Sequence, residues 1–281
     1  IKKRKRIDSW SFNSRRVSPE FKWSPDSFPV YFSREIELPP IDADEQLILR
    51  NWFGGESLVR INGITYGEIN THHRELDLSV FAGEVVLYEA DVVPKGLFGS
   101  SIKEPVFSES DLLIVDSDIK RIIGKLRNLI ELFTYTDDEV LASSLYRILS
   151  DNLAGIRIPR DSSGYRKAVL DDPEISGEVS AVWLPEEFTR SEGQRLSEED
   201  HNTFTEAERN VEEELANLKR RFPSRLTMTL SGHAHIDYAW LWPLEETRRK
   251  ILRTFSNSVR LAKKYPEYIF SQSSAAMYRD V

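Results

Sequence analysis

The sequence predicts an α+β protein of several domains: an antiparallel β-sandwich of jelly-roll type, a helical middle region, and a strand–helix–strand unit. Three observations favour this class. Residues 20–105 contain short segments rich in β-branched and aromatic residues, and apolar residues recur at helical spacing from residue 108. In residues 225–275, the apolar pattern is typical first of a strand, then of a helix and then of a second strand. We expect domains at residues 1–107, 108–200 and 201–281.

Strands are expected where short apolar segments lie between Pro, Gly, Asn and Asp residues. These segments are residues 30–38, 45–52, 57–63, 74–80 and 83–93. Asn62-Gly63 is a dipeptide that accepts positive φ at both positions, so it predicts a two-residue hairpin turn. Several strands of this length predict a sandwich.

The helical region is expected to begin near Ser108 and to form a helical hairpin. The first helix has one apolar face, made by Leu112, Ile119, Ile122, Leu126, Leu129, Ile130 and Leu132. A second helix is expected near Asp137 and Asp138, because acidic residues complement the partial positive charge of a helix N-terminus. It carries Val140, Leu141, Leu145, Ile148 and Leu149.

Residues 153–200 are polar and rich in turn residues, which predicts a connector and a domain boundary. A third helix is expected over residues 203–221, ending before Phe222-Pro223. Its inward face would consist of Phe204, Ala207, Val211, Leu215 and Leu218.

The last part alternates as a strand over residues 225–236, becomes helical after Pro243, and returns to a strand over residues 267–275. Proline suits a first helical position. The inward face of this helix is expected to hold Ile251, Leu252, Phe255, Val259 and Ala262. Strand, helix and strand at this spacing form the unit of a parallel sheet.

Chemistry concentrates in GHAHIDYAWLWP, residues 232–243. In an extended chain, residues two apart point the same way with Cα atoms about 6.6 Å apart, so His233, His235 and Asp237 would share one side at a strand's carboxyl end. Imidazole and carboxylate are ordinary zinc ligands, and a third ligand would come from elsewhere. The alternative is that these histidines are polar groups satisfied within the fold.

Aromatic residues offer two further candidate sugar sites. Of Trp240 and Trp242, we expect at least one in the core, while the other could be a flat platform for a sugar face. Within the sandwich, Trp52, Phe53, Tyr66 and the pair His72-His73 could line a glycan site, although a sandwich edge or an oligomer contact would explain them as well.

The run GHAHIDYAWLWPLEETRRK, followed by FSNSVRLAKKYPEYIFSQSSAAMY, resembles glycoside hydrolase family 38, the zinc-dependent retaining α-mannosidases. The likeness is to the branch with cytosolic, vacuolar and bacterial members. It is strong over residues 225–281 and weaker over residues 30–100. There, NWFGGESLVRINGITYG and GLFG look like the sandwich that precedes the catalytic domain in that branch.

This resemblance implies that His235 and Asp237 bind zinc, for which cobalt could substitute, and that Trp240 stacks against a sugar. His233 is left without an assigned role, and orienting another ligand is as consistent as binding metal. Residues 201–281 would open a barrel-like α/β catalytic domain acting on terminal α-mannosyl residues of oligosaccharides.

The family's nucleophilic Asp and its remaining His ligand lie on later strands, beyond Val281. The resemblance therefore implies that none of these 281 residues is the nucleophile. We expect the chain alone to be inactive and to need the rest of the catalytic domain as its partner.

Composition excludes several other classes. Acidic residues outnumber basic ones by 46 to 38, for a net charge of -8, which argues against nucleic acid as a partner. Cysteine is absent, so disulfides and thiolate metal sites are excluded. The sequence has no apolar run of about 18 residues, so we expect no membrane span and a cytoplasmic location.

Two alternatives stay open. His-x-His at a strand end also resembles the amidohydrolases, which use paired imidazoles on zinc. The chain could instead be a non-catalytic module, either carbohydrate-binding or structural, and such a module could contact a second copy in a homo-oligomer.

Overall fold

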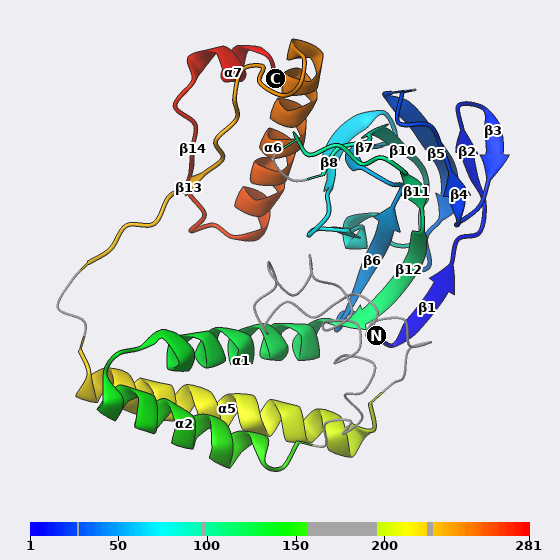
Figure 1. The fold of residues 1–281 in the computed structure, drawn as a ribbon. Coiled ribbons are helices and arrows are strands. Elements are labelled where there is room, and N and C mark those ends of the chain that lie inside the picture. Colours follow the sequence, from blue (N-terminus) through cyan, green and yellow to red (C-terminus); the bar gives the residue numbers. More distant parts are fainter. Residues whose placement is uncertain (27, 97–98, 157–195, 224–226) are drawn as a thin grey trace. The chain divides into compact units, whose positions relative to one another are not determined.

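A computed structural model describes residues 1–26, 28–96, 99–156, 196–223 and 227–281, which form two compact units (Figure 1). One unit comprises Ile1–Arg4 with Ile114–Thr227, and the other comprises Lys5–Leu113 with Met228–Val281. The predicted α+β class is confirmed, since antiparallel sheets and several helices are present. None of the helices in the described ranges is both long and apolar enough to cross a membrane.

Two main sheets hold most of the strands. The larger has the order β3-β2-β5-β10-β7-β8, and each neighbouring pair in it is antiparallel. These strands span Arg15–Val17, Trp10–Phe12, Val30–Glu37, Val85–Val93, Glu56–Ile61 and Ile64–Ile69. The smaller sheet has the order β1-β12-β6-β9, with bounds Lys3–Arg6, Glu109–Asp116, Glu45–Trp52 and Glu75–Asp77. Two short strands, β4 (Phe21–Lys22) and β11 (Val106–Phe107), pair separately.

The two main sheets share a core of aromatic side chains, as the predicted sandwich requires. Trp10, on β2, donates its indole N–H to the Ser110 hydroxyl of β12 at 2.8 Å. The same indole packs edge-on against Phe53 and Tyr88, with ring centroids 4.9 and 5.3 Å away. The two sheets are therefore held together by large buried rings, each of which removes much apolar area from water.

The predicted hairpin turn is confirmed. Asn62 and Gly63 have φ of 52° and 77°, and β7 and β8 pair across them in the register Ile61↔Ile64. Asn62 also accepts a hydrogen bond from the Leu87 amide at 2.8 Å. The left-handed backbone at both positions is the reason that Asn and Gly suit this turn.

Three helices form the core of the first unit: α1 (Ser117–Tyr135), α2 (Glu139–Leu153) and α5 (Glu198–Arg221). The expected hairpin of α1 and α2 is confirmed, and Asp138 caps α2 by accepting from two amides. Helix α5 begins at Glu198 instead of residue 203, because Ser197 caps it there. Their apolar faces meet in one buried cluster: Ile119, Ile122, Leu126, Leu129, Leu145, Ile148, Leu149, Val211 and Leu218.

The expectation of a helix from Ser108 is wrong for residues 109–116. This segment is strand β12, and Leu112 is part of the sheet. Its residues Ser110–Val115 are all buried, so both faces are covered and no polar alternation marks the strand. Asp116 then caps α1, accepting from the Ile119 amide at 3.0 Å.

The C-terminal part contains β13 (Gly232–His233), α6 (Leu244–Lys264), β14 (Phe270–Ser271) and the short α7 (Ala275–Arg279). Strands β13 and β14 are parallel, with Gly232 opposite Phe270, so the predicted strand–helix–strand unit is confirmed. The strand expected over residues 225–236 is much shorter than predicted. Met228 and Leu230 lie outside it and are exposed, and residues 224–226 lie outside the described residues.

Helix α6 packs on strands β7 and β8 within the second unit (Figure 1). Pro243 is its N-cap instead of its first residue. Of the predicted inward face, Ile251 is fully buried, but Val259 and Ala262 are exposed. The prediction is wrong at these two positions: the buried residues of the helix all lie in its first half and include charged ones, Glu246 and Arg253, which an apolar pattern does not show. The connector predicted over residues 153–200 lies mostly outside the described residues.

Candidate functional site

The segment that follows β13 brings His235 and Asp237 together. The His235 Nε2 atom lies 3.0 Å from Asp237 Oδ1, within hydrogen-bonding distance. Both side chains are open to solvent, with exposed fractions of 79% and 42%. The two groups therefore project toward one another at an accessible place.

His233 does not join this pair as the alternation predicted. Its Nδ1 donates to the Ser271 carbonyl of β14 at 2.8 Å. Strand geometry ends at His233, so the alternation that would carry all three side chains to one side stops there. Within the part of the chain that the structure describes, no cluster of three or more His, Asp or Glu side chains could hold a metal ion.

The two tryptophans divide as predicted, with one in the core. Trp242 is 9% exposed, and Lys250 Nζ lies 4.7 Å above its ring. Gly99 also lies against this ring, and a Cβ added there would come within 2.8 Å of it. Trp240 is 57% exposed and touches Trp242 edge-on, with ring centroids 5.5 Å apart. The ring of Trp240, three residues after Asp237, thus presents a flat apolar face to solvent.

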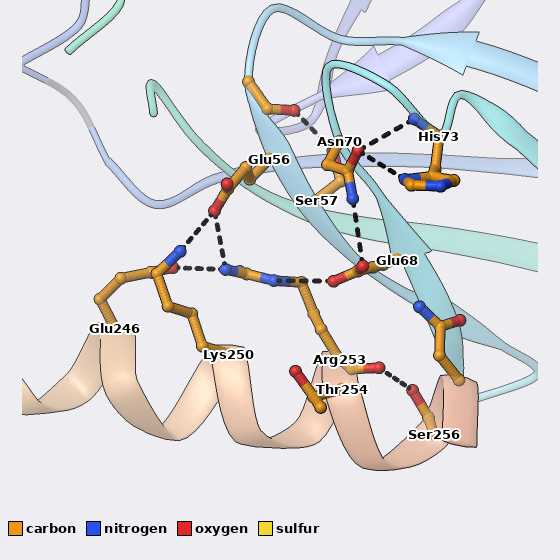
Figure 2. Close-up of polar contacts among 12 residues, drawn as sticks. Glu56, Ser57, Glu68, Asn70, His73, Glu246, Lys250, Arg253, Thr254 and Ser256 are labelled. Atoms are coloured by element: carbon orange, nitrogen blue, oxygen red, sulfur yellow. Dashed lines mark hydrogen bonds and ion pairs between the residues drawn. The ribbon is translucent and has the colours of Figure 1, made fainter. Parts of the chain in front are cut away.

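Ionised side chains hold α6 on the sandwich (Figure 2). Arg253 donates to Glu246 at 2.8 Å and to Glu56 of β7 at 3.0 Å, and Lys250 donates to Glu56 at 2.7 Å. Burial alone would lower the pKa of Arg253, but the carboxylates of Glu246, Glu56 and Glu68 raise it above its usual value. Arg253 therefore stays cationic although its side chain is buried.

Of the residues that could line a glycan site in the sandwich, Phe53 is excluded, because it is fully buried in the aromatic core. Trp52 is covered by the Arg74 guanidinium at 4.6 Å, and the Tyr66 hydroxyl donates to the Asp77 carbonyl at 2.7 Å. The backbone amides of the His72-His73 pair both donate to Asn70.

Thr247 was not among the residues that the sequence indicated. The side chain is fully buried, and its hydroxyl contacts the chain between Asp237 and Trp242. Apolar periodicity does not show its contacts, because two of its three partners are backbone groups brought close by the turn.

The donors at this site suit a divalent cation. A neutral imidazole nitrogen and a carboxylate oxygen are both common ligands of zinc, and here they already lie beside each other. Further ligands would have to come from other parts of a protein. The chemistry of the pair thus fits two positions of a metal site.

Comparison with known proteins finds its strongest similarity in the segment that contains His235 and Asp237. Residues 225–281 match the family described as "Glycosyl hydrolases family 38 N-terminal domain". The chain is 50% identical over 48 residues to "Alpha-mannosidase" of Saccharomyces cerevisiae, covering 17% of this chain and 4% of the relative. It is 46% identical over 52 residues to "Alpha-mannosidase 2C1" of Homo sapiens, covering 18% of this chain and 5% of the relative.

A third similarity extends over most of the chain. "Alpha-mannosidase G" of Dictyostelium discoideum is 22% identical over 231 residues, which covers 81% of this chain and 18% of the relative. The chain thus spans less than a fifth of the length of each of these relatives. The resemblance to family 38 that GHAHIDYAWLWP indicated is confirmed for residues 225–281.

Proposed function

We propose that this chain is the N-terminal part of a zinc-dependent retaining α-mannosidase, which hydrolyses terminal α-mannosyl residues of oligosaccharides. The observation that carries the proposal is the pairing of His235 with Asp237 at 3.0 Å, within the segment that matches family 38. Amidohydrolases would pair two imidazoles on the metal. Here His235 pairs with a carboxylate, and His233 donates to a carbonyl of β14.

His235 and Asp237 would hold the zinc ion, for which cobalt could substitute. Such an ion, when bound, acts as a Lewis acid and orients substrate oxygens. Both side chains are open to solvent, as ligands that must meet a sugar require. Trp240 would bind the sugar, because its exposed ring offers a flat apolar face beside these ligands.

The nucleophile is proposed to lie in polypeptide outside these 281 residues, so none of the residues seen here is assigned that role. Retention requires two carboxyl groups about 5 to 5.5 Å apart. Asp237 is proposed as a metal ligand and not as a member of that pair.

The domain plan follows from the same proposal. Residues 1–107 would be the jelly-roll-like sandwich, residues 108–200 the helical region, and residues 201–281 the opening of a barrel-like catalytic domain. In the C-terminal segment, the large apolar side chains of Met228, Leu230, Leu241 and Ile269 are exposed. Exposed apolar side chains are a feature of interaction surfaces, and we propose that the rest of the catalytic domain covers these four. The location is proposed to be the cytoplasm.

Turnover of an aryl α-mannoside tests the function. We expect no hydrolysis by the 281-residue chain with zinc or cobalt added, and metal-dependent hydrolysis by the full-length product of its reading frame. Turnover by the 281-residue chain that Asp237→Asn abolishes would overturn the proposal that the nucleophile lies elsewhere. A full-length protein inactive on α-mannosides but active on amides would overturn the assigned reaction.

A further inference from the structure

We propose that the hydroxyl of Thr247 is a positioning group that fixes the loop from Asp237 to Trp242, and so places the carboxylate of Asp237 and the ring of Trp240. This inference rests on the proposed function for the roles of those two side chains. The part of the inference that concerns the loop alone is argued from the contacts of Thr247.

The segment that carries the two proposed ligands has little strand pairing to hold it. Strand β13 ends at His233, so the sheet does not extend to His235. Before the ligands, the side-chain amide of Gln272 donates to the Ala234 carbonyl at 2.7 Å. After them, Thr247 is the side chain that contacts the backbone on both sides of Tyr238.

Three hydrogen bonds converge on the Thr247 hydroxyl. It accepts from the Ala239 amide at 2.9 Å and from the Trp242 indole at 3.1 Å. It can donate to the Asp237 carbonyl at 3.4 Å, which is the longest and weakest of the three. A hydroxyl has one donor and two acceptor positions, so these partners use all of them.

The loop needs such support because its backbone is strained. Ala239 has φ of 66°, in the left-handed region that residues other than Gly rarely occupy. The Ala239 amide that bonds to Thr247 belongs to this strained residue. This bond favours the reversal that sends the chain from Asp237 back to the buried Trp242 and leaves Trp240 outside.

Thr247 is itself held in place. It lies in the first turn of α6, where its amide donates to the Pro243 carbonyl at 3.2 Å. Lys250 and Arg253, farther along the helix, bind Glu56 of the sandwich (Figure 2). The hydroxyl is thus presented from a helix fixed on a sheet, which gives it a defined position relative to the loop.

Two substitutions separate the hydroxyl from ordinary packing. Thr247→Val keeps the branched shape but leaves the Ala239 and Trp242 donors without an acceptor. Thr247→Ser keeps the hydroxyl and loses only the methyl group. A positioning role predicts that Ser behaves as the native residue and Val does not, whereas a packing role predicts the reverse.

The test is hydrogen exchange of the Ala239 amide and the Trp242 indole in the 281-residue chain, followed by NMR. We expect exchange about tenfold faster in Thr247→Val, the loss of roughly one hydrogen bond, and native rates in Thr247→Ser. Unchanged rates in Thr247→Val, or equal acceleration in both variants, would overturn the inference. If the valine variant does not fold, Thr247→Ala is expected to give the same acceleration and is judged by the same criteria.

Zinc affinity of the full-length protein separates this inference from the proposed function. If the positioning role of Thr247 and the proposed function are both correct, Thr247→Val weakens zinc binding by about tenfold or more, as loss of a supporting contact does. Thr247→Ser then binds zinc with native affinity. Native zinc affinity in Thr247→Val, with a mannosidase-active native protein, overturns the positioning of Asp237 and leaves the function standing. A native protein that binds no zinc overturns the function, while the exchange result still supports the loop role.

Discussion

Arg253 of α6 donates a hydrogen bond to Glu56 of β7 at 3.0 Å, across 197 residues of sequence. Both side chains are buried, and Glu246 binds the same guanidinium from the first turn of the helix. Charges removed from water are tolerated only when partners compensate them. The segment that carries the candidate site is therefore joined to the sandwich by a buried ionic contact.

Replacing Arg253 should destabilise the second unit strongly. We expect Arg253→Met to cost about 3 kcal/mol of unfolding free energy, because Glu56 and Glu246 would lose their shared buried partner and keep only Lys250 and Arg249, respectively. Urea denaturation measures this change. Arg248→Met is the matched control, since the Arg248–Glu245 pair on the same helix is solvent-exposed and should be worth less than about 0.5 kcal/mol. Equal losses in the two variants would show that the buried contact is not special.

Glycine should be required at position 99 for two reasons: the positive φ of its backbone and the close approach of the Trp242 ring. It has φ of 75°, and a Cβ there would lie 2.8 Å from the Trp242 ring. Gly83 has φ of 83° but open space around it, so Gly83→Ala isolates the backbone strain. We expect about 1 kcal/mol for Gly83→Ala and at least about 1 kcal/mol more for Gly99→Ala, where the ring must also shift. Thermal unfolding compares the two, and equal costs would mean that Trp242 does not press on Gly99.

Glu208 should give the helical unit a stability that depends on pH. Partial burial raises the pKa of Glu208, but hydrogen bonds from Lys125, at 2.7 Å, and from Arg121 lower it below its usual 4.5. Because the folded state holds the ionised form, the stabilisation is complete above pH 4.5 and is lost as the pH falls through the lower folded-state pKa.

The variant Glu208→Gln tests this pH dependence. We expect it to be less stable than the native chain by about 1 kcal/mol at pH 7, with the difference shrinking as the pH falls below 4.5. The control Glu206→Gln should change little, because the Glu206–Arg209 pair is exposed and 3.7 Å apart. A difference between Glu208→Gln and the native chain that stays constant with pH would contradict the ionic explanation.

Much of the fold could be predicted from the sequence, because most strands and helices bury one of their faces and expose the other to solvent. The strand at Val30–Glu37 and the turn at Asn62-Gly63 follow from alternation and from turn chemistry. Strand β12 could not be found in this way, since it is covered on both faces and its apolar run fits a helix equally well.

The pair of side chains at the candidate site could be predicted from the sequence, but the residues that support it could not. The motif shows His235 and Asp237 directly, and their pairing needs only a local bend after β13. Arg253 looks like a solvated helix residue, because its partner Glu56 is distant in sequence. Thr247 looks like a helix-start residue, because the groups it binds are two backbone positions and an indole.

The proposed metal site is best tested by the zinc content of the full-length protein, measured by elemental analysis after exhaustive dialysis. We expect one zinc ion per native molecule, loss of that ion in His235→Ala and in Asp237→Asn, and its retention in His233→Ala. Retention of zinc in Asp237→Asn together with its loss in His233→Ala would contradict the claim and favour a site of paired imidazoles.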